Sequence, residues 1–96
     1  MLDTIISNID SDLAFISENT DNAFALKSVN IINIKMDYIR NKTYSTKETV
    51  YALCDKMANF DVRNMRNIPE LSEEVYSRID SLYNEILLIK DAYFEN

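Results

Sequence analysis

The chain contains no histidine, no glycine and no tryptophan among its 96 residues. Without histidine it lacks the side chain that most often titrates near neutral pH and the commonest nitrogen ligand for metals. Without glycine it lacks the residues that a phosphate-binding P-loop or a dinucleotide-binding fingerprint requires. These absences exclude the residue combinations on which the familiar active sites depend, so we expect neither an enzyme nor a bound cofactor.

The remaining metal-binding residue types show no pattern that is typical of a site. The single cysteine, Cys54, excludes an intramolecular disulfide framework and a cysteine-rich zinc site. We expect it to be a small buried hydrophobe. The acidic residues match no calcium-binding loop of the twelve-residue type, which also needs a glycine at its bend. Glu70, Glu73 and Glu74 are expected to serve the start of a helix, and we predict no metal.

No segment has the features of a membrane span or of a secretory signal. The longest apolar runs fall far short of the roughly 18 residues that cross a bilayer. Asp3 stands where a signal peptide would carry basic residues. We therefore expect a cytoplasmic protein. The abundance of Asn, Ile, Lys and Tyr is typical of an AT-rich genome and favours a phage or low-GC bacterial origin.

The apolar residues recur at alternating steps of three and four, the period of one face of an α-helix. With no glycine and a single proline, Pro69, the chain has none of the favoured turn signals of β-hairpins. Four such series predict helices at about 3–17, 22–41, 46–65 and 72–94. The short connections favour a single all-α domain, a small antiparallel four-helix bundle. The alternative is a helical hairpin that completes its core by homo-oligomerisation.

Short polar side chains mark where these helices begin, because their oxygens accept hydrogen bonds from free N–H groups of the first turn. The break at 18–22 is the weakest, and one helix from 3 to 41 is the alternative there. The expected caps are Asp3, Asp21 or Asn22, Ser45 with Glu48, and Ser72.

The third series consists of Val50, Leu53, Met57 and Phe60, and Asn64 occupies its next position. Asp61 also falls on the apolar side of this helix. Because buried polar groups are costly unless they are hydrogen-bonded, we expect both Asp61 and Asn64 to reach solvent near the helix end. The alternative is that a polar residue on the apolar face fixes the register or the oligomeric state.

Charge is segregated along the chain. Residues 1–22 carry five acids and no base, residues 23–66 carry eight bases and four acids, and residues 67–96 carry seven acids and two bases. The three blocks have net charges of −5, +4 and −5, which sum to −6. We expect the acidic ends and the basic middle to attract one another when they pack side by side.

The second and fourth predicted helices carry more apolar residues than one core face requires. On the second helix a further line lies beside the main stripe, and Ile34 lies further round. Packing against two neighbours within the bundle is the alternative to an interface. The predicted interface residues are Phe24, Ile31, Tyr38, Tyr76, Tyr83, Leu87 and Phe94.

We therefore expect a small protein-interaction module, an inhibitor, adaptor or regulator, that docks on another protein or on a second copy of itself as a homo-oligomer. The alternative is a nucleotide- or nucleic-acid-binding module in which Lys27, Lys35 and Arg40 contact anions. The net charge of −6 is unlike that of a typical nucleic-acid binder, so direct binding is not our first expectation. A third hypothesis is an inhibitor whose acidic first and fourth helices mimic DNA and occupy the basic groove of a DNA-binding protein.

Overall fold

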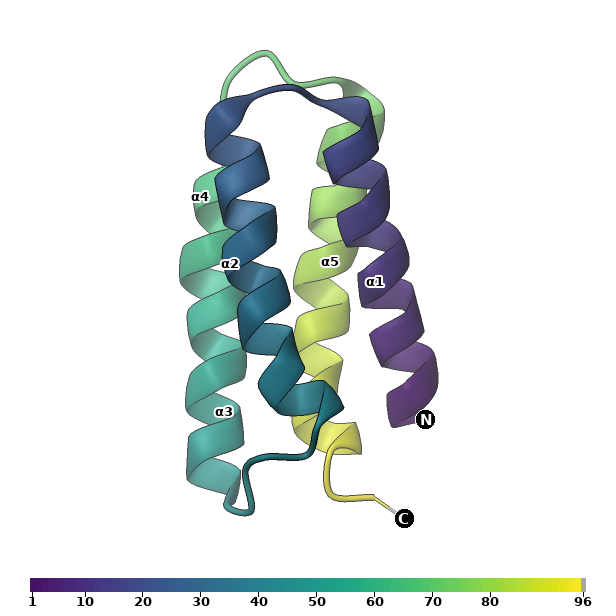
Figure 1. Cartoon of the computed structure of the whole chain (residues 1–96), viewed down its shortest axis with the longest axis vertical. Coiled ribbons are helices and arrows are strands. Elements are labelled where there is room, and N and C mark those ends of the chain that lie inside the picture. The colour runs from purple at the N-terminus through teal and green to yellow at the C-terminus, as the bar shows by residue number, and fades with distance from the viewer. Residues whose placement is uncertain (96) are drawn as a thin grey trace.

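The computed structural model describes residues 1–95, and these form an antiparallel bundle about 40 Å long (Figure 1). The third helix of the bundle is one continuous rod made of α3, η1 and α4. The all-α bundle predicted from the sequence is therefore confirmed. The elements are α1 (Leu2–Asn19), α2 (Ala23–Arg40), α3 (Lys47–Lys56), the π-helix η1 (Met57–Val62), α4 (Arg63–Arg66) and α5 (Glu73–Ala92).

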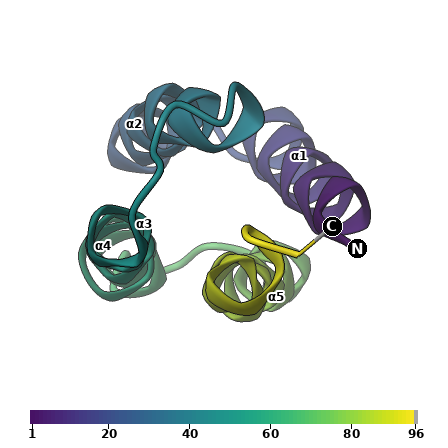
Figure 2. The same cartoon turned by 90° about the horizontal axis from the view of Figure 1, so that it is seen from below.

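The helices follow one another around a ring, so that α1 adjoins α2 and α5, and the α3–α4 rod adjoins α2 and α5 (Figure 2). Each helix begins and ends within two residues of its expected range. The chain breaks between α1 and α2 at residues 20–22, so residues 3–41 form two helices.

The core lies on the ring's axis and is made by the apolar faces of all four helices. In α2 every member of the inner face is buried, and Cys54 of α3 is fully buried as expected. Burying such side chains stabilises a fold by about 1.5–3 kcal/mol each. The buried inner face of α2 consists of Ala25, Val29, Ile32, Met36 and Ile39.

Two of the helix starts are capped as the sequence predicts. The Asn22 side chain accepts hydrogen bonds from the amides of Phe24 and Ala25, both at 3.0 Å. The Ser72 hydroxyl accepts one from the amide of Val75 at 3.2 Å. These side chains satisfy N–H groups that have no partner inside their own helix.

The other two expected caps were wrong. Thr46, not Ser45, caps α3 by accepting a hydrogen bond from the amide of Thr49, because the helix starts one residue later than the capping-box pattern implies. Asp3 does not cap α1, because that helix already begins at Leu2 and places Asp3 inside the first turn. There its charge still faces the positive end of the helix dipole.

An ion pair joins every pair of neighbouring helices in the ring. Two of these pairs, Arg40–Asp10 and Arg66–Asp80, link the basic middle of the chain to its acidic first and last parts, in the way that the charge segregation predicts. The interhelical pairs are Arg40–Asp10 (α2 to α1), Lys35–Asp61 (α2 to η1), Lys90–Asp55 (α5 to α3), Arg66–Asp80 (α4 to α5) and Arg78–Asp12 (α5 to α1).

A candidate interaction surface on α2 and η1

The middle of the α3–α4 rod is the π-helix η1, in which backbone hydrogen bonds span five residues instead of four. Such segments frequently occur at functional sites. The wider turn places two adjacent residues inward at each end of η1, Met57 with Ala58 and Asp61 with Val62. As a consequence Phe60 points outward and is 57% exposed. The prediction that Phe60 belongs to the core face was wrong, because it assumed the ordinary period of 3.6 residues.

The same change of period buries Asp61, which is 3% exposed, whereas Asn64 is exposed as expected. The expectation that solvent reaches Asp61 was therefore wrong. Its carboxylate accepts a hydrogen bond from the ammonium group of Lys35 on α2, with an Nζ–Oδ2 distance of 2.5 Å. The ammonium compensates a charge that would otherwise be costly to remove from water. The ion pair fixes η1 against α2.

On its outward side α2 carries a second apolar row. Phe24 is 74% exposed, Ile34 is 63% exposed, and Tyr38 is 42% exposed, while Ile31 is half-buried. With Lys27 these residues follow one another at steps of three, four, three and four, the spacing by which one helix packs against another in a coiled coil. We call this row, Phe24, Lys27, Ile31, Ile34 and Tyr38, the outer seam.

The outer seam continues into a groove beside α3. The Tyr38 ring stacks on that of Tyr44, with 5.5 Å between the ring centroids. Tyr44 lines an open groove of about 480 Å³ together with Glu48, Thr49, Ala52, Leu53 and Lys56. The lining residues come from α3 and the loop before it, and α2 packs on η1 and α4 of the rod.

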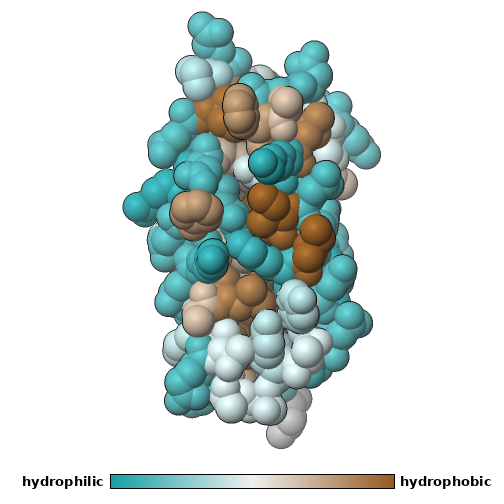
Figure 3. Space-filling view, turned by 60° about the vertical axis from the view of Figure 1, so that its left-hand side comes forward, coloured by the Kyte–Doolittle hydropathy of each residue, from teal (hydrophilic) through white to brown (hydrophobic). Residues whose placement is uncertain are grey.

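Figure 3 shows several apolar patches, separated by polar residues, on this face of the molecule. The outer seam, Tyr44, Leu53, Lys56 and Phe60 together are called the docking surface below.

The aromatic residues predicted on the last helix lie on a different side and are engaged within the bundle. Tyr76 is half-buried; its hydroxyl donates to the carbonyl of Ile68 and accepts from the amide of Leu71. The Tyr83 hydroxyl donates to the side chain of Asn59 at 2.9 Å. These two tyrosines tie α5 and the preceding loop to the α3–α4 rod.

The last two predicted interface residues lie toward the C-terminal end of α5. Leu87 is half-buried and packs against the core. Phe94 is exposed and meets the edge of the buried Tyr93 ring, with 4.8 Å between the centroids. Neither side chain lies on the elements that form the docking surface.

The three basic residues considered for anion binding do not converge. Lys35 is engaged with Asp61. Arg40 pairs with Asp10 at 2.5 Å and with Asp37 at 2.8 Å, on the side of α2 that faces α1. Within residues 1–95, Lys27 alone of the three has no ion-pair partner.

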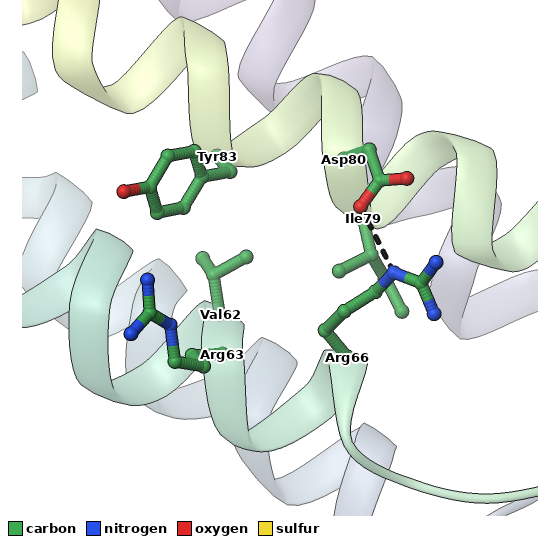
Figure 4. Close-up of a pocket in the computed structure, with 6 residues that line it drawn as sticks. All are labelled: Val62, Arg63, Arg66, Ile79, Asp80 and Tyr83. Atoms are coloured by element: carbon green, nitrogen blue, oxygen red, sulfur yellow. Dashed lines mark hydrogen bonds and ion pairs between the residues drawn. The ribbon is translucent and has the colours of Figure 1, made fainter.

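A second hollow lies between the α3–α4 rod and α5, with a volume of about 210 Å³ (Figure 4). Val62 and Ile79 form its apolar wall. The Arg66 side chain crosses its rim to Asp80, with an Nε–Oδ1 distance of 3.0 Å. Arg63, Arg66, Asp80 and Tyr83 complete the lining.

The titratable groups with shifted pKa values do not form a reactive site. Burial raises the pKa of the Cys54 thiol to about 12, so the thiol stays protonated at neutral pH. The hydrogen bond to Asp55 raises the pKa of the Lys90 ammonium group, which keeps it charged. Among residues 1–95 no three potential metal ligands of the Cys, Asp or Glu type come together, and no helix is long and apolar enough to cross a bilayer.

The docking surface was visible in the sequence only in part. Phe24, Ile31 and Tyr38 were selected from helical geometry, and the spacing of the complete outer seam can be counted in the sequence. Tyr44 and Phe60 were missed, because the first lies in a loop and the second depends on the π-helix. No family model, no curated protein and no solved structure matches this chain.

Proposed function

We propose that this protein is a small interaction module that acts as an inhibitor, adaptor or regulator by docking a helix of a protein partner on its docking surface. The observation that carries the proposal is the outer seam of α2, an exposed row with the spacing of a helix–helix contact. A core face needs only one such row, and α2 already has a complete buried one.

Contacts from a second helix account for this exposed row. Phe24 and Ile34 bury little surface within the bundle, whereas a docked helix would cover both and remove their apolar area from water. The Lys35–Asp61 pair and the Tyr38–Tyr44 stack hold both sides of the surface in place. A partner would therefore meet a surface that is already ordered, which lowers the entropy cost of binding.

A photo-crosslinking amino acid placed at Ile34 tests this proposal in the cells that produce the protein. We expect a discrete protein adduct from position 34. Leu88 is the matched control, because it is another exposed apolar residue, 46% exposed, but lies on α5. Position 88 should give no such adduct, and Phe24→Glu should abolish the adduct at position 34. No adduct from position 34, or the same adduct from both positions, would contradict the proposal.

A further inference from the structure

We infer that the partner of the docking surface is an acidic amphipathic helix of another protein. The inference rests on the proposed function and names the chemistry of the partner. The outer seam runs from Phe24 to Tyr38, which is about 21 Å at 1.5 Å per residue. An occupant that matches it presents about four turns, with apolar side chains at steps of three and four.

The charge of the surrounding elements selects an acidic occupant. Residues 23–66 contain both α2 and the α3–α4 rod and carry a net charge of +4, while the rest of the chain carries −10. Lys27 lies within the outer seam, and Lys56 lines the groove below it. Glu48 lines the same groove two turns before Lys56 on α3, and therefore further from the outer seam. Neither lysine makes an ion pair within residues 1–95.

These two lysines lie toward opposite ends of the surface. The α3–α4 rod runs antiparallel to α2, and Asp61 lies level with its partner Lys35. Lys56 is therefore level with about residue 40 of α2, beyond Tyr38, whereas Lys27 lies one turn from Phe24. Acidic residues near both ends of the docked helix would meet them. Such pairs raise the association rate and disfavour basic helices.

A second copy of this chain fits the surface less well. Two docking surfaces facing each other would bring basic elements together. The acidic helices of a second copy offer less exposed apolar surface, because α1 exposes no large apolar side chain and Leu88 is the one that α5 exposes. Tyr76, Tyr83 and Leu87 of α5 are half-buried against their own bundle. A contact between the basic face of one copy and the acidic face of the next would be head-to-tail and would not close as a dimer does.

Nucleic acid fits the surface less well for a different reason. Phosphates would find Lys27 and Lys56, but Phe24, Ile31 and Ile34 would remain without apolar partners. An acidic amphipathic helix satisfies both the apolar row and the two lysines.

The test uses three labelled synthetic peptides of about 21 residues, or three heptads. One is a helix with leucine at the seam positions and glutamate beside them, one has lysine in place of glutamate, and one is a scrambled acidic sequence. Fluorescence anisotropy measures their binding to the wild type, Ile34→Glu, the double variant Lys27→Glu/Lys56→Glu, and the control Leu88→Glu. Far-UV circular dichroism establishes that each variant remains helical.

We expect the acidic helix to bind the wild type and Leu88→Glu alike. Its affinity should fall by at least about tenfold, or 1.4 kcal/mol, in Ile34→Glu and in the double variant. The double variant should prefer the basic helix, and the scrambled peptide should not bind.

Other results would overturn the inference in distinguishable ways. Equal binding of the acidic and basic helices, lost in Ile34→Glu, would remove the acidic partner and leave the proposed function standing. A dimer in sedimentation that Ile34→Glu dissociates would identify a second copy as the occupant. Binding of a short DNA duplex that the lysine double variant abolishes would put nucleic acid there. A monomer that binds no probe would overturn both proposals.

Discussion

At the scale of single residues, the environment of Cys54 shows how burial alters a side chain without creating a site. The thiol is fully buried among apolar residues of the core, and this burial raises its pKa from 9.0 to about 12. A reactive cysteine needs the opposite shift, because the thiolate is the nucleophile. Cys54 therefore belongs to the packing of the bundle.

The raised pKa of Cys54 makes the stability of the protein depend on pH in the alkaline range. Below pH 9 the thiol is protonated in both states, and its contribution is fully present. Above pH 9 the unfolded chain loses the proton and the folded chain keeps it until about pH 12. The free energy of unfolding should therefore fall as pH rises, by at most about 1.4 kcal/mol per pH unit.

The measurement is urea unfolding of the wild type and of Cys54→Ala across this range. The variant removes the thiol, so the difference in free energy of unfolding between the two proteins should shrink as pH rises above 9. Tyrosines and lysines titrate in the same range in both proteins, and the subtraction removes them. A difference that stays constant with pH would contradict the assignment.

Single residues also show where apolar periodicity predicts burial correctly and where it does not. Met36 and Ile39 continue the three–four spacing of apolar residues on α2, which predicts a core face, and both are fully buried. Phe60 was placed inward by the same rule and points outward. The rule assumes a constant number of residues per helical turn. It therefore misplaces side chains wherever the backbone locally departs from that number, as it does in η1.

At the scale of elements, the π-helix is the feature that periodicity did not reveal. No glycine or proline marks it, because η1 reads Met-Ala-Asn-Phe-Asp-Val. One signal was present: the adjacent residues Met57 and Ala58 are both apolar, and Asp61 with Val62 follows four residues later, a spacing that suits a wider turn if Asp61 has a partner. That partner, Lys35, lies 26 residues away on another helix. Predicting the pair requires knowing how α2 and the rod are placed against each other.

Removing one partner of the Lys35–Asp61 pair should lower the stability of the protein far more than replacing both partners by apolar residues. Asp61→Ala leaves a largely buried ammonium group without its carboxylate, so we expect a loss of about 3 kcal/mol. Replacing both partners, as Lys35→Met/Asp61→Leu, should restore stability to within about 1 kcal/mol of the wild type.

Urea unfolding of Lys35→Met, Asp61→Leu and the double variant Lys35→Met/Asp61→Leu gives the coupling energy directly, and Asp61→Ala is measured beside them. The exposed pair Arg40–Asp10 is the control, since Asp10→Ala should cost only about 0.5 kcal/mol. A loss for Asp61→Ala as small as that for Asp10→Ala would show that the buried pair does not fix η1 against α2.

At the scale of the whole molecule, the four helices should unfold as one unit. Every neighbouring pair shares the core and is joined by an ion pair, so no helix can leave without exposing the others. Far-UV circular dichroism and near-UV tyrosine signals should give the same midpoint in urea. An earlier tyrosine transition would indicate that part of the bundle opens separately.

The overall architecture could be predicted from the sequence because it depends on a few simple quantities. Helix lengths, short connections and four apolar faces leave few arrangements, and the up-down-up-down bundle is the simplest. The docking surface depends instead on which apolar residues remain uncovered after the core is complete. The exposure of these side chains depends on how all four helices pack together, so it cannot be predicted from the spacing of residues along the chain.

The stack of Tyr38 on Tyr44 also gives the molecule an optical property. With no tryptophan and six tyrosines, its ultraviolet emission comes from phenol rings alone, and two of these, Tyr38 and Tyr44, belong to the docking surface. A helix that arrives with a tryptophan would receive excitation energy from these rings and quench their emission. The unmodified protein can therefore report its own occupancy in a fluorimeter, without a dye attached to the surface under study.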